Sequence, residues 1–261
     1  MSTDSQVSQI NAALEEPPPE MGEAPQTVVE LTIGIEIDDD WVTTAIVREL
    51  TGEDEEHLAS FENKKDLLYA EYMSEVLKLA VVSIGDFVVS KSPSIIHKLT
   101  LADRDTLYLG IVKATYGESR ELRSACPSCG ESNDILLSLD EDFPIRKPSF
   151  DPRVGLEVKT HKATYHLRLP TGEDMVSVQK KTNNVAEFNT HVLANCVMFE
   201  GKAPKDRIAW AKKLNVGERK KLIDTLLGVE VGPDMKEVNA QCAACEKDIP
   251  LVFDWVSLLL S

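Results

Sequence analysis

The sequence predicts an α+β protein with two tandem copies of a strand–helix–cysteine-turn–strand unit, joined by a shared four-cysteine zinc site and preceded by an extended N-terminal arm. Three observations support this fold class. Short phrases recur in one order at almost constant spacing, a Cys-x-x-Cys pair lies late in each copy, and apolar residues follow strand-like and helix-like periods in turn. A chain of 261 residues with 43% hydrophobic residues can bury a sizeable core without disulfides.

The N-terminal arm covers residues 1–27, which are polar and acidic and include three consecutive prolines at 17–19. Such a segment cannot bury enough apolar surface to offset its ordering entropy. It is either a disordered tail or an arm that orders only against a neighbour in an assembly. Residues 28–37 then alternate apolar and polar side chains, which predicts the first strand.

Recurring phrases define the two copies. Arg48-Glu-Leu-Thr-Gly-Glu-Asp54 recurs as Arg168-Leu-Pro-Thr-Gly-Glu-Asp174, 120 residues later. Leu99-Thr-Leu-Ala-Asp-Arg104 corresponds to Leu214-Asn-Val-Gly-Glu-Arg219 at an offset of 115, and the two cysteine pairs are offset by 116. We therefore expect a first repeat over residues 28–145, a Pro- and Gly-containing linker over 146–155, and a second repeat over 156–261.

Each phrase also predicts the start of a helix. Thr followed three residues later by Asp is a capping-box signature, and Asn215 with Glu218 has the same form. These acids are therefore interpreted as helix starts and not as catalytic carboxylates. Arg104 and Arg219 follow two of the caps; they are interpreted as helix-surface charges, with pairing to acids across the copies as the alternative.

Helical and strand-like periods complete the unit. Four amphipathic helices are expected around the following apolar positions: Leu68, Tyr72, Val76 and Leu79; Leu107, Ile111 and Thr115; Phe188, Val192, Cys196 and Phe199; Leu222, Leu226 and Val229. Cys196 lies on an apolar face, so it is predicted to be a core residue. Alternating runs at 134–139 and 248–253 predict a strand after each cysteine turn.

The four paired cysteines are the candidate metal ligands: Cys126, Cys129, Cys242 and Cys245. Each pair supplies half of a tetrahedral site, so the two turns are expected to share one structural zinc ion (Zn2+) per chain. Gly130 and the proline after Cys126 favour the ligand turn, whereas Cys242-Ala-Ala-Cys245 lacks both residue types.

Three other interpretations of the cysteines stay open. A redox Cys-x-x-Cys normally starts a helix in a thioredoxin-like unit, and here strands follow. The pairs could bind metal separately with histidines, but the five histidines show no matched placement between the copies. The second pair could also be metal-free.

Enzymatic chemistry has no visible motif. The chain contains no Gly-rich phosphate loop, no His-Glu-x-x-His and no Gly-x-Ser-x-Gly. A zinc ion bound by four thiolates has no open position for water, so the expected site is structural and the protein is expected not to be an enzyme.

The charge of the chain narrows the classes of partner. Lys and Arg total 28 and Asp and Glu total 44, for a formal net charge of −16 at pH 7. Phosphate backbones and anionic lipid repel such a chain, so partners are expected to include no nucleic acid and no membrane. No signal peptide or bilayer-length apolar stretch is recognised, so synthesis in the cytoplasm is expected.

These motifs resemble the T4-type phage baseplate protein family. The resemblance rests on Arg168-Leu-Pro-Thr-Gly172 and on the four paired cysteines, and it extends over about residues 28–258. It implies a non-enzymatic baseplate or hub subunit, or an assembly factor, of contractile tails and related injection systems. It further implies several copies packed among other tail proteins, in the virion after assembly in the host cytoplasm. The acidic arm and the poorer second cysteine turn depart from the family pattern.

Two other functions remain as alternatives. Cys126-Pro-Ser-Cys-Gly130 also suits a zinc-ribbon-type regulator that binds nucleic acid, although the chain lacks a basic stripe. A thiol redox enzyme is the third possibility. The apolar run at 255–260 is expected either to cover a partner surface or to belong to the core of the protein itself.

Overall fold

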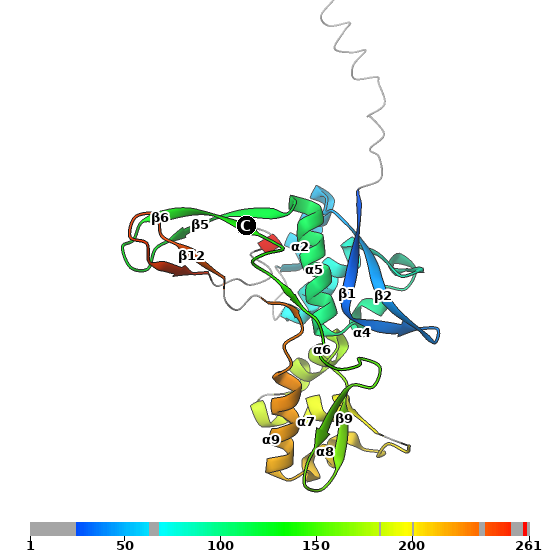
Figure 1. Ribbon diagram of the computed structural model, residues 1–261. Helices are drawn as coiled ribbons and strands as arrows, with labels where there is room; N and C mark the ends of the chain where they lie inside the picture. Colours follow the sequence, from blue (N-terminus) through cyan, green and yellow to red (C-terminus); the bar gives the residue numbers. More distant parts are fainter. Residues whose placement is uncertain are drawn as a thin grey trace, which may run out of the picture.

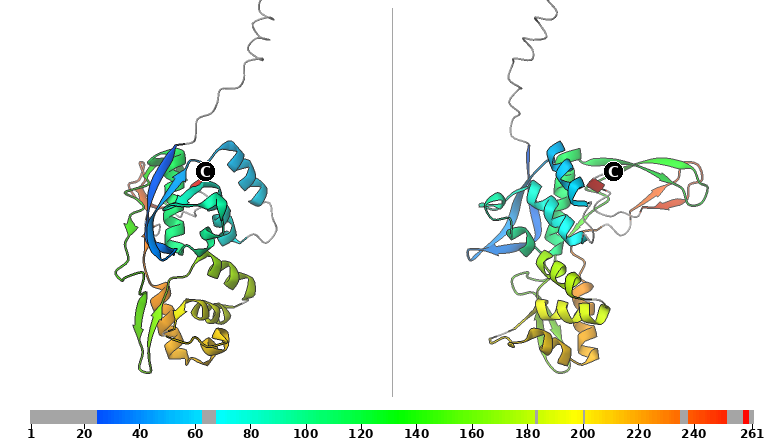
Figure 2. Two further views of the ribbon diagram at one scale, coloured as in Figure 1. Left: turned by 90° about the vertical axis from the view of Figure 1, so that its right-hand side faces the viewer. Right: turned by 180° about the vertical axis from the view of Figure 1, so that it is seen from behind.

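The computed structural model describes residues 25–62, 68–182, 184–199, 201–234, 238–251 and 258–259. These residues form two lobes and a pair of cysteine-bearing hairpins that projects sideways from the first lobe (Figure 1). The two further views show the same three parts, with the second lobe below the first (Figure 2). Most of the expected N-terminal arm, residues 1–24, lies outside the described residues.

The first lobe packs helices against an antiparallel sheet of order β1-β2-β3-β4. Its elements are β1 (Gln26–Ile37), β2 (Asp40–Arg48), α2 (Gly52–Glu62), α3 (Tyr69–Ala80), β3 (Val81–Ile84), β4 (Phe87–Val88), the 3-10 turn η1 (Val89–Lys91), α4 (Ile95–Lys98) and α5 (Leu101–Tyr116). The predicted first strand and both predicted helices of this half are confirmed.

The second lobe is smaller and has its own sheet of order β8-β9-β10. Its elements are β8 (Leu156–Lys159), β9 (Thr164–Leu167), α6 (Gly172–Lys181), α7 (Val185–Cys196), β10 (Val197–Met198), α8 (Arg207–Lys213) and α9 (Val216–Leu227). In both lobes a β-hairpin is followed by two helices, a strand paired to that hairpin, a short helix and a longer helix, and in the first lobe β4 and η1 come between that strand and the short helix.

Two hairpins carry the cysteines. The first consists of β5 (Ser119–Ala125) and β6 (Ser132–Ser138), and the second of β12 (Asn239–Gln241) and β13 (Asp248–Pro250). The sequence interpretation placed a strand only after each cysteine turn. The structure corrects it, because a paired strand also precedes each turn.

The chain enters and leaves the second lobe along one path. There β7 (Ile145–Arg146) pairs with β11 (Gly232–Pro233), so residues at the expected start of the linker meet residues that lead back to the cysteine hairpins. The second cysteine hairpin therefore lies beside the first one and not within the second lobe, as Figure 1 shows for β5, β6 and β12.

Two clusters of buried side chains form the cores. One cluster joins the first lobe to both cysteine hairpins and includes Leu137 of β6 and Ile249 of β13. The other fills the second lobe, where Cys196 is fully buried, as the apolar helical face predicts. In the C-terminal run, Leu258 and Leu259 are buried in the first cluster, which favours the core interpretation for these two residues. The rest of that run lies outside the described residues.

The predicted capping boxes start the first helix of each lobe. The Thr171 hydroxyl accepts from the Asp174 amide and the Asp174 carboxylate accepts from the Thr171 amide, at the start of α6. Thr51 and Asp54 make the same two bonds at the start of α2. Each acid also binds the arginine of its phrase, with an Arg168–Asp174 distance of 2.6 Å. The interpretation of these acids as helix starts is therefore confirmed.

Asp103 and Glu218 use their carboxylates differently. Thr100 and Asn215 cap α5 and α9 as predicted. The Asp103 carboxylate, however, accepts from the amides of Ile33 and Gly34 in β1, with the first at 2.8 Å. Glu218 likewise accepts from the Thr160 hydroxyl, at 3.1 Å, beside β8. Both acids therefore tie the longer helix of a lobe to that lobe's hairpin.

Asp174 yields a first prediction. Burial alone would raise the pKa of Asp174, but the hydrogen bonds from Arg168 and Thr171 outweigh burial and hold this pKa below its ordinary value. A carboxyl group with a depressed folded pKa stabilises the fold above its unfolded pKa of about 4, and this stabilisation is lost as the pH falls through the folded pKa. We expect Asp174→Asn to cost about 1–3 kcal/mol at pH 7 and much less near pH 3.

Urea unfolding of the two proteins at both pH values measures this difference. The exposed Asp224, which pairs with Lys220 within α9, offers a control. Asp224→Asn is expected to change stability by about 0.5 kcal/mol or less. Equal effects of the two substitutions at pH 7 would contradict the prediction.

Candidate metal centre

The cysteine pairs lie in the turns of the two hairpins, and the turns have matching backbone bonds. In the first, the Cys126 amide donates to the Glu131 carbonyl at 2.8 Å and the Gly130 amide to the Cys126 carbonyl at 2.9 Å. In the second, the Cys242 amide donates to the Lys247 carbonyl and the Glu246 amide to the Cys242 carbonyl, both at 2.9 Å. Each turn thus points two sulfur atoms in one direction.

All four sulfur atoms lie within 4.8 Å of one another. Across the hairpins, the Cys126 and Cys245 sulfurs are 3.7 Å apart and the Cys129 and Cys242 sulfurs 3.6 Å apart. A tetrahedral ion with metal–sulfur bonds of about 2.3 Å places its ligands about 3.8 Å from one another. The cysteines carry no disulfide. Two cysteine pairs that are offset by 116 residues in the sequence therefore form one cluster that can hold a metal ion.

The electrostatics of the cluster favour a bound cation. The backbone amide of Ala244 donates to the Cys242 sulfur and lowers the pKa of this thiol to about 6. At Cys129 the amide of Glu131 favours the thiolate, but the neighbouring sulfurs of Cys245 and Cys242 outweigh it and raise the pKa to about 12. Four thiolates so close together repel one another, and a divalent cation removes that repulsion.

Asn133 connects the two turns, and the sequence interpretation missed it. Its side-chain amide donates to the Glu131 carbonyl at 2.9 Å and lies 3.6 Å from the Cys242 sulfur. Its side-chain oxygen accepts from the Ala243 amide at 2.9 Å, across the hairpins. Asn133 occupies an inward position of β6, in register with Ile135 and Leu137. A polar residue at an inward position was the signal that could have revealed this role.

The two turns differ at one strained residue. Gly130 has a φ of 78°, and at the matching place Glu246 has a φ of 59°. A left-handed backbone costs a residue with a Cβ atom about 1–2 kcal/mol, and glycine nothing comparable. Glu246, which takes the place of the glycine in the second turn, is therefore held in the same left-handed conformation as Gly130.

This strain gives a second prediction. Glu246→Gly should stabilise the metal-loaded protein by about 0.5–1 kcal/mol, because the relief of strain exceeds the added entropy of the unfolded chain. Gly130→Ala, the matched opposite change, should destabilise it by about 1 kcal/mol. Thermal unfolding of both variants at saturating metal measures the two shifts. Shifts of the same sign would show that the turns do not share this constraint.

The other interpretations of the cysteines gain no geometric support. Within the described part of the chain, the metal-capable cluster contains the four paired cysteines and no histidine. A thioredoxin-like redox pair starts a helix. Both pairs of this protein lie in hairpin turns instead. The fifth cysteine, Cys196, is remote from the cluster in the second core, where burial raises its pKa to about 12.

Comparison with known proteins adds one finding. A family model described as T4 bacteriophage base plate protein matches residues 32–199. This region begins within β1, contains the rest of the first lobe, the first cysteine hairpin and the second lobe as far as β10, and ends before Cys242 and Cys245. No curated protein and no solved structure matches the chain. Among the described residues, no helix has the length and apolar character of a membrane span.

Proposed function

Because the chain belongs to the T4 bacteriophage base plate protein family, we propose that it is a non-enzymatic structural or assembly component of the tail baseplate, in a phage or a related contractile injection machine. The family implies a structural role in the baseplate, association with other tail proteins and a place in the virion tail. The family match is the single observation that carries the proposal, since it covers more than half of the chain. We further propose several copies per assembly, and host cytoplasm as the place of assembly.

We propose that Cys126, Cys129, Cys242 and Cys245 hold one structural zinc ion per chain. The cross-hairpin sulfur distances of 3.6 and 3.7 Å support a tetrahedral site. The donor set consists of four thiolates, which suit zinc and leave no ligand position open for chemistry. When bound, zinc supplies cross-linking and no reaction: it joins two hairpins that lie more than a hundred residues apart in the sequence.

We also propose that residues 28–145 and 156–261 derive from one duplicated unit, with 146–155 as the linker. The matched order of elements supports this proposal. So do the arginines of the second phrase: Arg104 donates to the Ala70 carbonyl and the Ser74 hydroxyl, and Arg219 to the Ala186 carbonyl and the Thr190 hydroxyl. In each lobe this arginine joins the longer helix to the second helix at matching positions.

A zinc-ribbon-type regulator that binds nucleic acid is the second candidate. The observation in its favour is the layout of the cluster, in which two hairpin turns share four cysteines. The net charge of −16 opposes it. Measurement of DNA and RNA binding between low and physiological salt decides between the two, because a basic binding surface produces affinity that falls steeply with salt.

The baseplate proposal is tested by interrupting the gene in the phage that carries it and examining the tails. We expect lysates without complete tails, and restoration of tails when the protein is supplied in trans. Mass spectrometry of purified wild-type particles then separates a subunit from an assembly factor, because only a subunit stays in the particle. Complete, infectious particles from the interrupted gene would overturn the proposal.

A further inference from the structure

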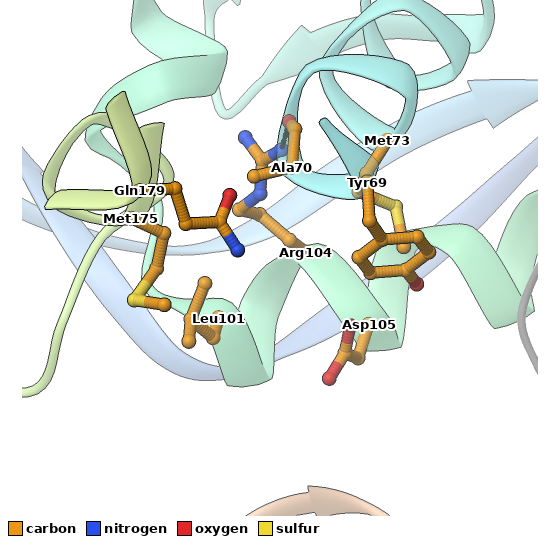
Figure 3. Close-up of a pocket in the computed structure, with 8 residues that line it drawn as sticks. All are labelled: Tyr69, Ala70, Met73, Leu101, Arg104, Asp105, Met175 and Gln179. Atoms are coloured by element: carbon orange, nitrogen blue, oxygen red, sulfur yellow. Dashed lines mark hydrogen bonds between the residues drawn. The ribbon is translucent and has the colours of Figure 1, made fainter. Parts of the chain in front are cut away.

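A cavity of about 160 Å3 lies where the two lobes meet. Helices α3 and α5 of the first lobe and α6 of the second contribute its walls, as Figure 3 shows. Its size is similar to that of a cavity of roughly 150 Å3 that accepts a benzene-sized ligand, so five or six heavy atoms fit. The cavity is distant from the cysteine cluster and plays no part in the metal site proposed above.

Most of the wall is apolar and adaptable. Met73 of α3 and Met175 of α6 face the cavity together with Leu101 at the start of α5. Unbranched methionine side chains adjust their shape to a slender occupant. Such a lining suits a straight hydrocarbon chain better than a polar ligand of the same size.

One wall residue has a carboxylate without a direct hydrogen-bond or ion-pair partner among the described residues. Asp105 of α5 lines the cavity, and no hydrogen bond or ion pair of its carboxylate occurs among the residues that the structure describes. The neighbouring Arg104 does not neutralise it by contact, because its guanidinium donates to the Ala70 and Ile96 carbonyls and to Ser74. Burial raises the pKa of Asp105 to about 7, against the opposing effect of the Arg104 charge.

We propose that this cavity binds a lysine side chain of a partner protein, with the four-carbon stem between Met73 and Met175 and the ammonium group on Asp105. A single carboxylate matches the compact charge of an ammonium group, whereas the planar fork of arginine calls for paired acceptors. A net charge of −16 on this chain also favours a partner with basic residues. The identification of the partner as another tail protein rests on the proposed baseplate function. The match between the cavity and a lysine side chain does not depend on that function.

The proposal is tested on the full-length protein with methionine methyl groups labelled with 13C. n-Pentylammonium, which copies the stem and charge of lysine, is titrated at pH 8, and 1-pentanol serves as the uncharged control. We expect saturable shifts of the Met73 and Met175 methyl signals, assigned with the Met73→Leu and Met175→Leu variants. Pentylammonium should bind at least tenfold more tightly than pentanol. No shift, or equal affinity for both probes, would overturn the proposal.

Asp105→Asn isolates the role of the carboxylate. This variant should lose at least tenfold in affinity for pentylammonium while its affinity for pentanol stays unchanged, which also shows that the cavity is still folded. Asp86→Asn, at an exposed acid of the same lobe, should change neither affinity. An unchanged affinity of Asp105→Asn for pentylammonium would contradict the proposal.

The pH dependence gives an independent check. The charged and titratable groups that face Asp105 are Arg104 on α5 and Tyr69 on α3, and α6 presents the uncharged Met175 and Gln179. Of these cavity-facing groups, only Asp105 is expected to change charge between pH 6 and 8, so affinity for pentylammonium should rise about tenfold over that range. A flat profile would exclude Asp105 as the partner of the ammonium group. If the protein binds the probe but tails assemble without it, the baseplate function is refuted and the lysine-binding proposal stands.

Discussion

Replacement of Cys126 by serine is expected to remove the proposed zinc ion and to separate the two cysteine hairpins. Each hairpin supplies only two of the four ligands, and a tetrahedral structural site does not persist when one thiolate is lost. Native mass spectrometry of the wild-type protein should show one zinc ion per chain, and Cys126→Ser and Cys245→Ser should each show none. These two variants test one turn each, so equal losses mean that the turns share a single ion.

Loss of the ion should also destabilise the first lobe. Leu137 and Ile249 of the two hairpins belong to the same buried cluster as α5, so separated hairpins expose part of that core. We expect the melting temperature to fall by on the order of 10 °C, both in the serine variants and after treatment with a chelator. Differential scanning calorimetry with and without added zinc measures this change.

Cys196 is the matched control, because it is the one cysteine outside the two pairs. Cys196→Ala should keep the zinc ion, although it removes a buried sulfur atom from the core of the second lobe. Two zinc ions per chain would contradict the shared site, and so would a wild-type protein that binds none at saturating zinc.

Arg104→Ala is expected to be the most destabilising substitution outside the cysteine cluster. The Arg104 side chain is only 1% exposed. Its guanidinium donates to the Ile96 carbonyl at 3.0 Å, to the Ala70 carbonyl at 2.9 Å and to the Ser74 hydroxyl at 2.8 Å. Burial lowers its pKa to about 10, so it stays charged at neutral pH. Truncation removes these three buried hydrogen bonds and opens a cavity, which together cost about 3–5 kcal/mol.

Arg219 is the natural comparison, since it makes two corresponding bonds in the second lobe while its side chain is partly exposed. Arg219→Ala should cost only about 1 kcal/mol, because water satisfies the acceptors that it leaves. Urea unfolding of the two variants, at saturating zinc, measures the contrast. Equal losses of stability would mean that burial by the second lobe is not what makes Arg104 important.

Local chemistry explains why part of this fold could be predicted. The capping boxes depend on residues three apart, so Thr51, Asp54, Thr171 and Asp174 revealed the starts of α2 and α6 directly. The cysteine spacing likewise identified the four residues that the structure brings together. By contrast, β5 has no buried residue and β12 is three residues long, so neither has an apolar pattern that marks it as a strand.

Arg104 shows where sequence reasoning was wrong. It was interpreted as a helix-surface charge, with pairing to an acid across the copies as the alternative, but it is buried and its guanidinium donates to two backbone carbonyls and one hydroxyl of its own lobe. The start of α6 covers it instead: the Gly172 amide donates to the Leu99 carbonyl at 3.1 Å, and a Cβ atom at residue 172 would clash with the guanidinium. No such cover is present over Arg219, which remains partly exposed.

The amino-acid sequence by itself determined the helix starts, the two recurring sets of motifs and the identity of the clustered cysteines, because each depends on residues close together in the chain. Tertiary structure alone decided that the second cysteine hairpin returns to the first lobe, that Asn133 links the two turns, and that one of two similar arginines is buried. Those outcomes depend on packing between segments far apart in the sequence, and neither periodicity nor spacing carries information about which distant surfaces meet.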